Sequence, residues 1–440
     1  MDHLFVRVGK RPVLIADVCA SADGEGIGYG MVLKRIDKVL SLARATRAAV
    51  FYSREARSIN TAVFRLRSDA VAILPRTGWQ ALWLRLAWTV TAPFRLGAPR
   101  LWIQRMLARA LLGRFYDAVE RSRHVPRPLR RLITRPRSFH RTLRRANAAY
   151  AALSASAWKH TYERHVPRPV RTKARERQPA PPRLSLPVDR EREAIRQAAV
   201  LGITPAARLV TVHVRESGYR SSAGLRQREW DVLRNARIDT YFKAFAALVE
   251  RGYTVVRLGD PTMSPIDRPG VVDLATSPHR TEWLEAWCVL RSDFLIGCDS
   301  GPSWLAALAG VPVLTVNAIH FRDIVRPADR MICKRARERA TGRTLTIADM
   351  LTDRYLRTGL DRDTYEHLDN DRSDIRDAVV DMIDVVGGEG RLSWAQRSIN
   401  KRLAALARES ARDWSGLEGV GCIRRPRGAL SRRFAKKYLG

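Results

Sequence analysis

Short apolar runs alternate with amphipathic stretches through the middle of the chain, between residues 206 and 386. In order, the runs read RLVTVHV, YTVVRLGD, GVVDLA, DFLIG and VPVLTV. Stretches with helical periodicity separate them, one from Asp239 to Arg251 and another from about Thr281 to Leu290. Because strands that alternate with helices of this length form βαβ units, the pattern predicts an α/β fold with a parallel sheet.

The most informative segment, residues 292–317, reads SDFLIGCDSGPSWLAALAGVPVLTVN. It predicts a strand, a tight turn, a short helix and a second strand. Asp299 or Ser300 can cap the helix, whereas Pro302 suits its first turn and Gly310 its C-terminal cap. The turn would direct unpaired N–H groups toward the carboxyl edge of the sheet, where a diphosphate is the expected ligand. An ordinary turn without a ligand, with Asp299 only as a cap, is the alternative.

A second polar strand end lies in RLVTVHVRESGY, residues 208–219, where alternation puts His213 and Arg215 on one face. If the strand ends near Arg215, its guanidinium lies at the same edge as the Ser300 turn. Arginine binds phosphate oxygens through two parallel hydrogen bonds and stays charged near neutral pH. A structural ion pair with Glu216 or another nearby acid is the alternative.

A third strand end, in the run from Tyr253 to Asp260, carries Arg257, Gly259 and Asp260. Several strand ends with residue types that bind phosphate or ribose therefore converge on one predicted edge. Such convergence is what a nucleotide site requires. The sequence shows no pair of carboxylates at a recognisable spacing, so it does not indicate a glycosidase.

Charge is distributed unevenly along the 440 residues, which are enough for two domains. The chain has 79 Lys and Arg against 44 Asp and Glu, a net charge of +35. Residues 206–386 are neutral, with 26 basic and 26 acidic side chains, whereas residues 1–205 carry 40 basic and 14 acidic ones. Residues 387–440 carry 13 basic and 4 acidic side chains, so the positive excess lies on both sides of a neutral domain.

The densest basic region lies between Arg100 and Arg177, where 21 basic residues face four acidic ones. Apolar stripes with tryptophan and arginine lie before and within it, at Trp79, Trp83, Arg85, Trp88, Trp102, Arg105 and Arg109. Because both residue types favour a lipid headgroup interface, we expect a basic helical insertion, from about 76 to 200, that contacts an anionic membrane surface. Nucleic acid is the less favoured partner, since no helix-turn-helix, zinc-finger or RNA-recognition signature occurs in the sequence.

The cellular location is predicted from membrane-span, secretory-signal and cysteine patterns that the sequence does not contain. The sequence has no run of about 20 apolar residues and no secretory signal pattern at its start. Its five cysteines have no C-x-x-C spacing, which favours a reducing compartment and argues against a zinc site or a disulfide framework. We therefore expect a cytoplasmic protein, peripheral on the inner face of a membrane, with no metal and no cofactor.

Both ends of the chain predict further structure. RPVLIADV and AAVFYS read as strands on either side of the glycine-containing loop CASADGEGIGYG and a helical run. Near the other end, after the breaker GGEG, a helical pattern places Trp394, Ile399 and Leu403 near one face. We expect a folded C-terminal end, with a disordered basic tail as the alternative.

Several segments resemble a family of bacterial GT-B glycosyltransferases: HVRESGY, RNARIDTY, YTVVRLGDP, DFLIGCDSGPSWLAALAGVP and the terminal RGALSRRFAKKYLG. The HxR-type strand is similar to the donor-binding half of fucosyltransferases. The segment DSGPSWLAALAGVP is similar to the part of heptosyltransferases that receives the sugar nucleotide. The resemblance is dense from about residue 208 to 386 and sparse before it. It implies two Rossmann-like domains facing across a cleft, the second binding a nucleotide-sugar donor, usually without a required metal.

The resemblance also implies roles for individual residues. Arg215 would contact the diphosphate, Ser300 and Gly301 would cradle it, and His213 would support the site. The resemblance further implies that Asp260 or Asp299 would touch the ribose or base. Apart from the resemblance, we expect donor contacts from Tyr219 and from Arg257 and Gly259 at the third strand end.

The first domain would supply the catalytic base. In a two-domain glycosyltransferase its glycine-containing loop would face the donor, which makes Asp23 and Glu25 candidates for deprotonating the acceptor hydroxyl. Solvated turn residues are the alternative reading of these two carboxylates.

The expected organisation is an acceptor domain over 1–205, a donor domain over 206–386 and a basic helical tail over 387–440. The expected reaction moves a sugar from a nucleotide-diphosphate sugar to a hydroxyl of a surface glycan or a lipid-linked acceptor. A polyanion-binding protein on an α/β scaffold and an inactive sugar-nucleotide-binding protein are the alternatives.

Overall fold

The structure is a computed structural model that describes most of the chain from residue 184 onward and parts of the chain before it. The described residues are 2–8, 11–17, 47–51, 66, 71–73, 184–218, 232–298, 300–319, 321, 326–359, 361–413 and 426–439. The chain divides into two compact units, of which the second contains all described residues from 184 onward.

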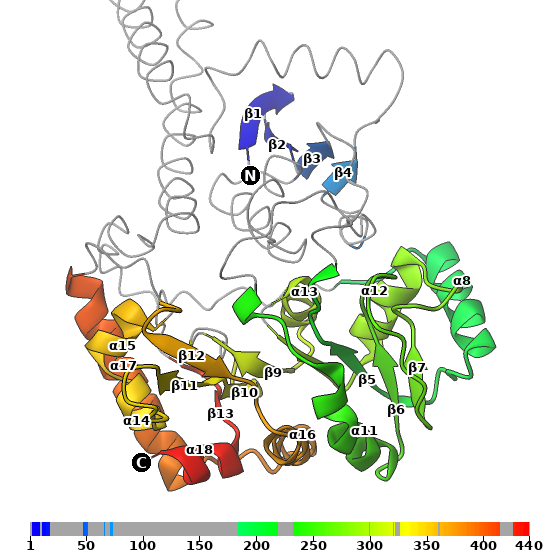
Figure 1. The fold of residues 1–440 in the computed structure, drawn as a ribbon. Coiled ribbons are helices and arrows are strands. Elements are labelled where there is room, and N and C mark those ends of the chain that lie inside the picture. The colour runs from blue at the N-terminus through cyan, green and yellow to red at the C-terminus, as the bar shows by residue number, and fades with distance from the viewer. Residues whose placement is uncertain are drawn as a thin grey trace, which may run out of the picture. The chain divides into compact units, whose positions relative to one another are not determined.

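The first unit contains a four-stranded sheet in the order β1-β2-β3-β4 (Figure 1). Its strands are β1 (Asp2–Val8), β2 (Arg11–Asp17), β3 (Arg47–Phe51) and β4 (Val71–Ile73). β1 is antiparallel to β2, whereas β2, β3 and β4 are parallel to one another. The strands predicted at RPVLIADV and AAVFYS are confirmed, while β1 and β4 were not predicted. The glycine-containing loop and residues 76–183 of the expected basic insertion lie outside the described residues, whereas residues 188–200 of that insertion form a helix of the second unit.

The second unit is built on a seven-stranded parallel sheet in the order β13-β10-β9-β8-β5-β6-β7. Its strands are β5 (Arg208–His213), β6 (Tyr253–Arg257), β7 (Val271–Asp273), β8 (Phe294–Gly297), β9 (Val313–Ala318), β10 (Arg330–Cys333) and β13 (Ala429–Leu430). All residues of β8, β9 and β10 are buried, as expected for a parallel sheet that is covered on both faces. The α/β prediction for this part of the chain is confirmed.

Helices cover both faces of this sheet (Figure 1). One face carries α12 and α13, with α8 packed against α12, and the other carries α11 and α16. The helices are α8 (Val188–Val200), the 3-10 helix η3 (Ile238–Tyr241), α11 (Phe242–Val249), α12 (Glu282–Arg291), α13 (Gly301–Ala309), α14 (Ile347–Met350), α15 (Asp353–Thr358), α16 (Arg372–Val386), α17 (Trp394–Asp413) and α18 (Arg432–Tyr438). A separate antiparallel pair is formed by β11 (Arg335–Glu338) and β12 (Tyr365–Leu368).

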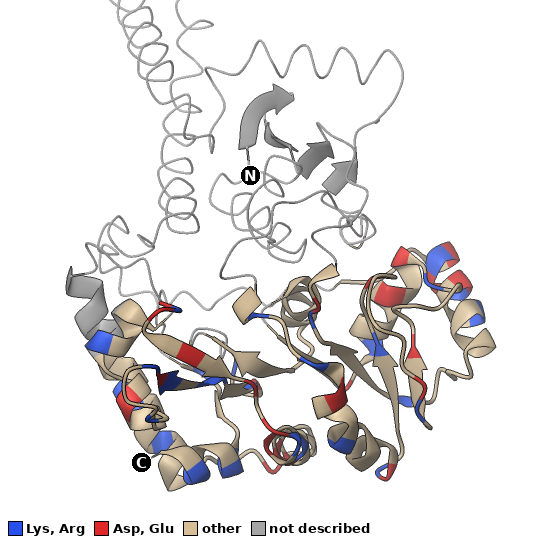
Figure 2. Ribbon diagram, in the orientation of Figure 1, with Lys and Arg blue, Asp and Glu red and all other residues tan. Residues whose placement is uncertain are grey.

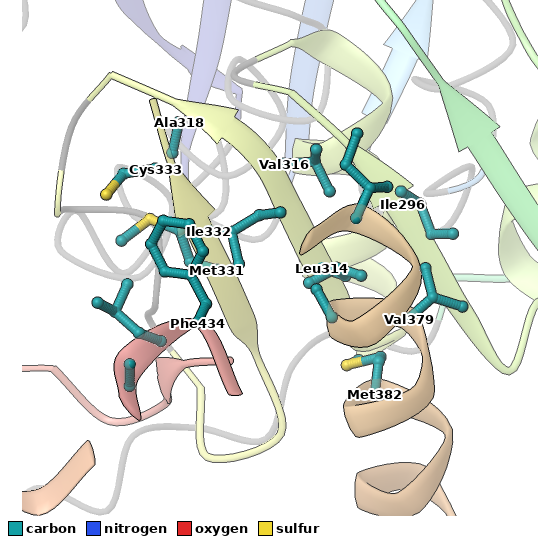
Figure 3. Packing of buried hydrophobic residues seen from close by; sticks show 14 of the residues in the cluster. Ile296, Leu314, Val316, Ala318, Met331, Ile332, Cys333, Val379, Met382 and Phe434 are labelled. Carbon is teal, nitrogen blue, oxygen red and sulfur yellow. The ribbon is translucent and has the colours of Figure 1, made fainter. Parts of the chain in front are cut away.

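The core between the sheet and α16 consists of aliphatic side chains with sulfur-containing ones among them. Figure 3 shows Val379 and Met382 of α16 beside Leu314 of β9, and Phe434 of α18 beside Met331 of β10. These five side chains are between 0% and 2% exposed, so the sheet and two helices close a continuous apolar layer.

This unit extends beyond the range 206–386 that was expected for it. At its start, α8 packs on α12, and the side chains of Gln197 and Thr281 form a hydrogen bond of 2.8 Å. At its end, β13 pairs with β10, and α18 packs on α16. The end of the chain is therefore folded over the described residues 426–439. Trp394 differs from its expected position on the packed face of α17, since it is 69% exposed, whereas Ile399 and Leu403 are buried as expected.

Charges of both signs are interspersed over this second unit (Figure 2). That distribution agrees with the 26 basic and 26 acidic side chains counted over residues 206–386. In the described part of the chain, no helix is both long enough and apolar enough to cross a bilayer.

Candidate functional site

The strand order of the second unit reverses between β5 and β8. From β5 the chain proceeds toward β6 and β7 on one side, whereas from β8 it proceeds toward β9 and β10 on the other. The two strands are paired in parallel, with His213 at the end of β5 opposite Gly297 at the end of β8. Ligands of open α/β sheets bind outside the carboxyl ends of the strands at such a switch point. The candidate site is therefore the carboxyl edge at His213 and Gly297, which we call the switch-point site.

The start of α13 lies directly after β8 at this edge. Ser300 occupies the N-cap position in an extended conformation, and its side chain makes no capping hydrogen bond. Its Oγ atom is buried and, among the described residues, meets the distance and angle criteria of a hydrogen bond with no partner, although it interacts with the Cys298 thiol and acts to lower the pKa of that group. Gly301 begins the helix and Gly310 ends it in the left-handed region, with φ 85°, as predicted. The first turn of α13 therefore presents backbone N–H groups and a hydroxyl at the switch-point site.

Close packing holds this turn against the end of β8. A Cβ atom on Gly297 would lie 2.4 Å from Ser303 Oγ and 2.9 Å from Leu295 Cδ2, so glycine permits the approach. Ser303 Oγ in turn donates to the Cys298 carbonyl at 2.9 Å. The close contact at Gly297 and the hydrogen bond of Ser303 thus hold the first turn of α13 against the end of β8.

Arg215 lies two residues beyond the end of β5. Its Nε donates to Asn235 Oδ1 at 3.1 Å, and its carbonyl accepts from the Ala236 N–H at 3.0 Å. Its positive charge acts to lower the pKa of both His213 and Cys298, and Cys298 Sγ lies 3.9 Å from the His213 carbonyl where β5 and β8 end. The structure therefore brings Arg215, His213 and the start of α13 to one edge.

His213 is half-buried at the end of β5, and its Nδ1 atom has no hydrogen-bond partner among the described residues. Burial, as the largest cause, and the nearby charge of Arg215 together lower the pKa of His213 to about 4, while Asp260 opposes the shift. The imidazole is therefore neutral near pH 7. A group with so low a pKa is a weak general base, because efficient proton transfer needs a pKa near the working pH.

Arg257 takes a different role from the ligand contact expected for it. It is fully buried, pairing with Glu216 at 2.7 Å and with Asp273 at 3.1 Å, and it donates to the Ser264 carbonyl at 2.7 Å. Two carboxylates thus match its charge and hold it inside the protein. Glu216, the partner considered for Arg215, instead forms this pair with Arg257.

Gly259 and Asp260 shape the turn that follows β6. A Cβ atom on Gly259 would lie 2.2 Å from Met263 Sδ, so the glycine makes room for a buried methionine. Asp260 Oδ1 accepts from the Thr262 N–H at 3.0 Å and also from its hydroxyl. Both residues have local structural roles, although the charge of Asp260 reaches His213.

Sequence reasoning gave no role to Arg234 and Lys334, two buried cationic residues near this edge. Arg234 is 3% exposed, and its charge acts on the Cys298 thiol together with that of Arg215. Lys334 is 4% exposed and directly follows β10. The only sequence signal for Arg234 was its place in RNARIDTY, one of the segments that carry the family resemblance.

Four predicted residues, Tyr219, Asp299, Asp23 and Glu25, lie outside the described residues. Their roles stay predictions. Among the residues that the structure describes, no group of three or more His, Cys, Asp or Glu side chains is arranged to hold a metal ion.

Comparison with known proteins adds little to this geometry. No protein-family model matches the chain, and no curated protein matches its sequence. One solved structure with partial similarity is a glycosyl transferase family 9 protein from Veillonella parvula DSM 2008, with 17% sequence identity and a TM-score of 0.22. The match covers 30% of this chain and 36% of that protein, so this chain corresponds to about a third of its length. Similarity of this extent carries no argument about function.

Proposed function

We propose that this protein is a glycosyltransferase whose switch-point site binds the diphosphate of a nucleotide-diphosphate sugar. The observation that carries the proposal is the convergence of Arg215, the first turn of α13 and the buried N-cap residue Ser300 at one switch point. A hydroxyl donor, backbone N–H groups and a guanidinium together match the oxygens of a diphosphate. The acceptor is a hydroxyl of a surface glycan or of a lipid-linked molecule.

Rate enhancement would come from stabilising the departing diphosphate. Negative charge grows on the leaving oxygens as the glycosidic bond breaks, so Arg215 and the helix terminus bind the transition state more tightly than the bound donor. One charge-assisted hydrogen bond contributes about 1.5 to 3 kcal/mol. In this proposal Gly301 lets the diphosphate approach the helix backbone closely.

The proton of the acceptor needs a separate base. Neutral His213 can donate a hydrogen bond to the ligand or accept one from it. Its low pKa makes it a weak proton acceptor. Asp23 and Glu25 therefore remain the proposed bases. Loss of turnover in an Asp23→Ala, Glu25→Ala double variant is the expected result, and wild-type turnover in that variant would remove both from the mechanism.

A thermal-shift screen tests the donor site. Purified protein is heated with GDP, UDP, ADP, CMP or dTDP, with and without a divalent metal. At a ligand concentration of about 100 times Kd, binding stabilises the folded state by about 2.7 kcal/mol. We expect selective stabilisation by one nucleotide, lost in Arg215→Ala and kept in Arg192→Ala, which removes an exposed arginine from α8.

Two outcomes of this screen would contradict the proposal. One is the absence of any shift with all five nucleotides in protein shown to be folded, which would favour a polyanion-binding protein. The other is an equal shift in wild type and Arg215→Ala, which would place the nucleotide elsewhere.

A further inference from the structure

A partly buried polar relay connects the carboxyl end of β10 with Arg215. Lys334 Nζ forms an ion pair with Asp369 Oδ1 at 2.6 Å and donates to the Asn235 carbonyl at 2.9 Å. The Asn235 side chain in turn accepts from Arg215 Nε at 3.1 Å. The side chain of Lys334 is only 5% exposed, so water competes little for its ammonium group, whereas the Asp369 side chain is 31% exposed.

The relay spans a considerable part of the sheet edge. β9 and β8 separate β10 from β5 in the sheet, a distance of about 14 Å at ordinary strand spacing. The segment 234–236 bridges these ends, since Asn235 bonds to Lys334 on one side and to Arg215 on the other. The Ala236 N–H also donates to the Arg215 carbonyl at 3.0 Å, so one short segment holds both the backbone and the side chain of Arg215.

An arginine side chain that the protein holds in one orientation can bind a ligand more tightly than a mobile one. Arginine side chains lose much rotamer freedom when they are ordered, which weakens binding if the ordering happens only with the ligand. An acceptor on Nε fixes the plane of the guanidinium. Ordering by the protein beforehand therefore improves affinity without a direct contact between Asn235 and the ligand.

We propose that Asn235, held by Lys334 and Asp369, is a positioning residue that orients the Arg215 guanidinium at the switch-point site before a ligand binds. This inference rests on the proposed function, because it assumes that Arg215 receives a diphosphate. The only sequence signal for Asn235 was its place in RNARIDTY, and no local pattern indicated this role, since Asn235 is separated from Arg215 by 20 positions and from Lys334 by 99.

A double-mutant cycle tests the proposal. Calorimetric titration with GDP, UDP, ADP, dTDP and inorganic pyrophosphate is applied to wild type, Asn235→Ala, Arg215→Ala and the double variant. We expect Asn235→Ala to weaken binding about tenfold and Arg215→Ala about 100-fold. The double variant should equal Arg215→Ala alone, because Asn235 acts only through Arg215. An Asn235→Ala effect that is absent, or that persists in the Arg215→Ala background, would overturn the inference.

Asn400→Ala is the matched control. It removes a comparable hydrogen bond, from Asn400 Nδ2 to the Gly428 carbonyl at 2.9 Å, on α17. Wild-type affinity is expected for this variant. Equal weakening in Asn400→Ala and Asn235→Ala would show a general loss of stability and would also overturn the inference.

A second readout separates the inference from the proposed function. Phenylglyoxal modifies arginine, and its rate at Arg215 can be followed on the corresponding peptide by mass spectrometry. If Asn235 holds the guanidinium, we expect Asn235→Ala to raise this rate several-fold, with no change in Asn400→Ala. An unchanged rate would overturn the positioning role even if nucleotides bind. If no nucleotide binds but the rate rises, the proposed function fails and the positioning of Arg215 stands.

Discussion

Burial sets the charge state of two histidines in the second unit. The pKa of His213 and that of His367 are both lowered to about 4, chiefly by burial, with further lowering by Arg215 and Lys334 respectively. Neither imidazole nitrogen of His367 has a hydrogen-bond partner among the described residues, and the same holds for Nδ1 of His213. Both residues are therefore neutral in the folded protein well below the pH at which an exposed histidine becomes charged.

This burial predicts a stability that falls in mild acid. Between pH 6.5 and about 4 the unfolded chain binds protons at these histidines and the folded chain does not, so the free energy of unfolding decreases as pH falls. The effect is at most about 3 kcal/mol per histidine. Thermal midpoints measured at pH 7.5 and 5.0 should differ less in a His213→Gln, His367→Gln variant than in wild type. An identical pH dependence in both proteins would show that other groups cause it.

At the scale of elements, the end of β8 and the first turn of α13 act as one structural unit. Gly297 permits contact between them, and Ser303 fastens the helix to the Cys298 carbonyl. The N-cap residue Ser300 makes no side-chain cap bond of its own, so packing rather than capping fixes this turn. A substitution that separates strand and helix should therefore affect ligand binding as well as stability.

Gly297→Ala tests this coupling. Its Cβ atom would lie 2.4 Å from Ser303 Oγ, and overpacking of this kind destabilises by about 1 to 3 kcal/mol. We expect a lower thermal midpoint together with weaker nucleotide binding. Addition of Ser303→Ala should restore part of both, because the Ser303 Cβ atom would lie 3.7 Å away. Gly390→Ala is the control, with nothing within 4 Å of the added atom; an equal loss there would contradict the explanation.

At the scale of the whole molecule, the last residues of the chain complete the second unit. β13 adds an edge strand beside β10, and the Ser431 N–H donates to the Met331 carbonyl at 2.8 Å. The Arg432 N–H donates to Asp381 on α16 at 2.9 Å, at the start of α18. Because these bonds join segments far apart in sequence, the second unit depends on residues close to the end of the chain.

Phe434→Ala measures that dependence. Phe434 is 2% exposed and packs in the same cluster as Met331, so its removal should destabilise the second unit by about 3 to 5 kcal/mol. Urea unfolding of wild type and variant provides the comparison. Lys436→Ala, an exposed position on the same helix, should change stability little. Similar small effects at both positions would mean that α18 is peripheral to the fold.

The net charge of +35 predicts binding to anionic surfaces. We expect co-sedimentation with anionic liposomes that exceeds binding to duplex DNA or RNA at matched salt, since tryptophan accompanies arginine before and within the region from Arg100 to Arg177. Neutral liposomes serve as the control. A clear preference for nucleic acid would contradict the membrane prediction.

The sequence by itself determined the order of elements from β5 to β9, because hydrophobic periodicity and the glycine and proline positions are local signals. It predicted the turn around Ser300, the C-terminal cap at Gly310 and the proximity of Arg215 to that turn, as the structure shows. It could not decide which arginine faces the edge. Arg215 and Arg257 both lie at or just beyond strand ends, but only tertiary contacts with Glu216 and Asp273 bury Arg257.

Only the tertiary structure decided the pairing of strands and the partners of buried polar groups. The switch point between β5 and β8 depends on how strands far apart in sequence pair, which no local pattern encodes. The same holds for the link from Lys334 through Asn235 to Arg215 and for the final strand β13 beside β10. Hydrogen bonds and ion pairs between distant segments depend on which segments the packed core brings together, so residue type and spacing do not reveal them.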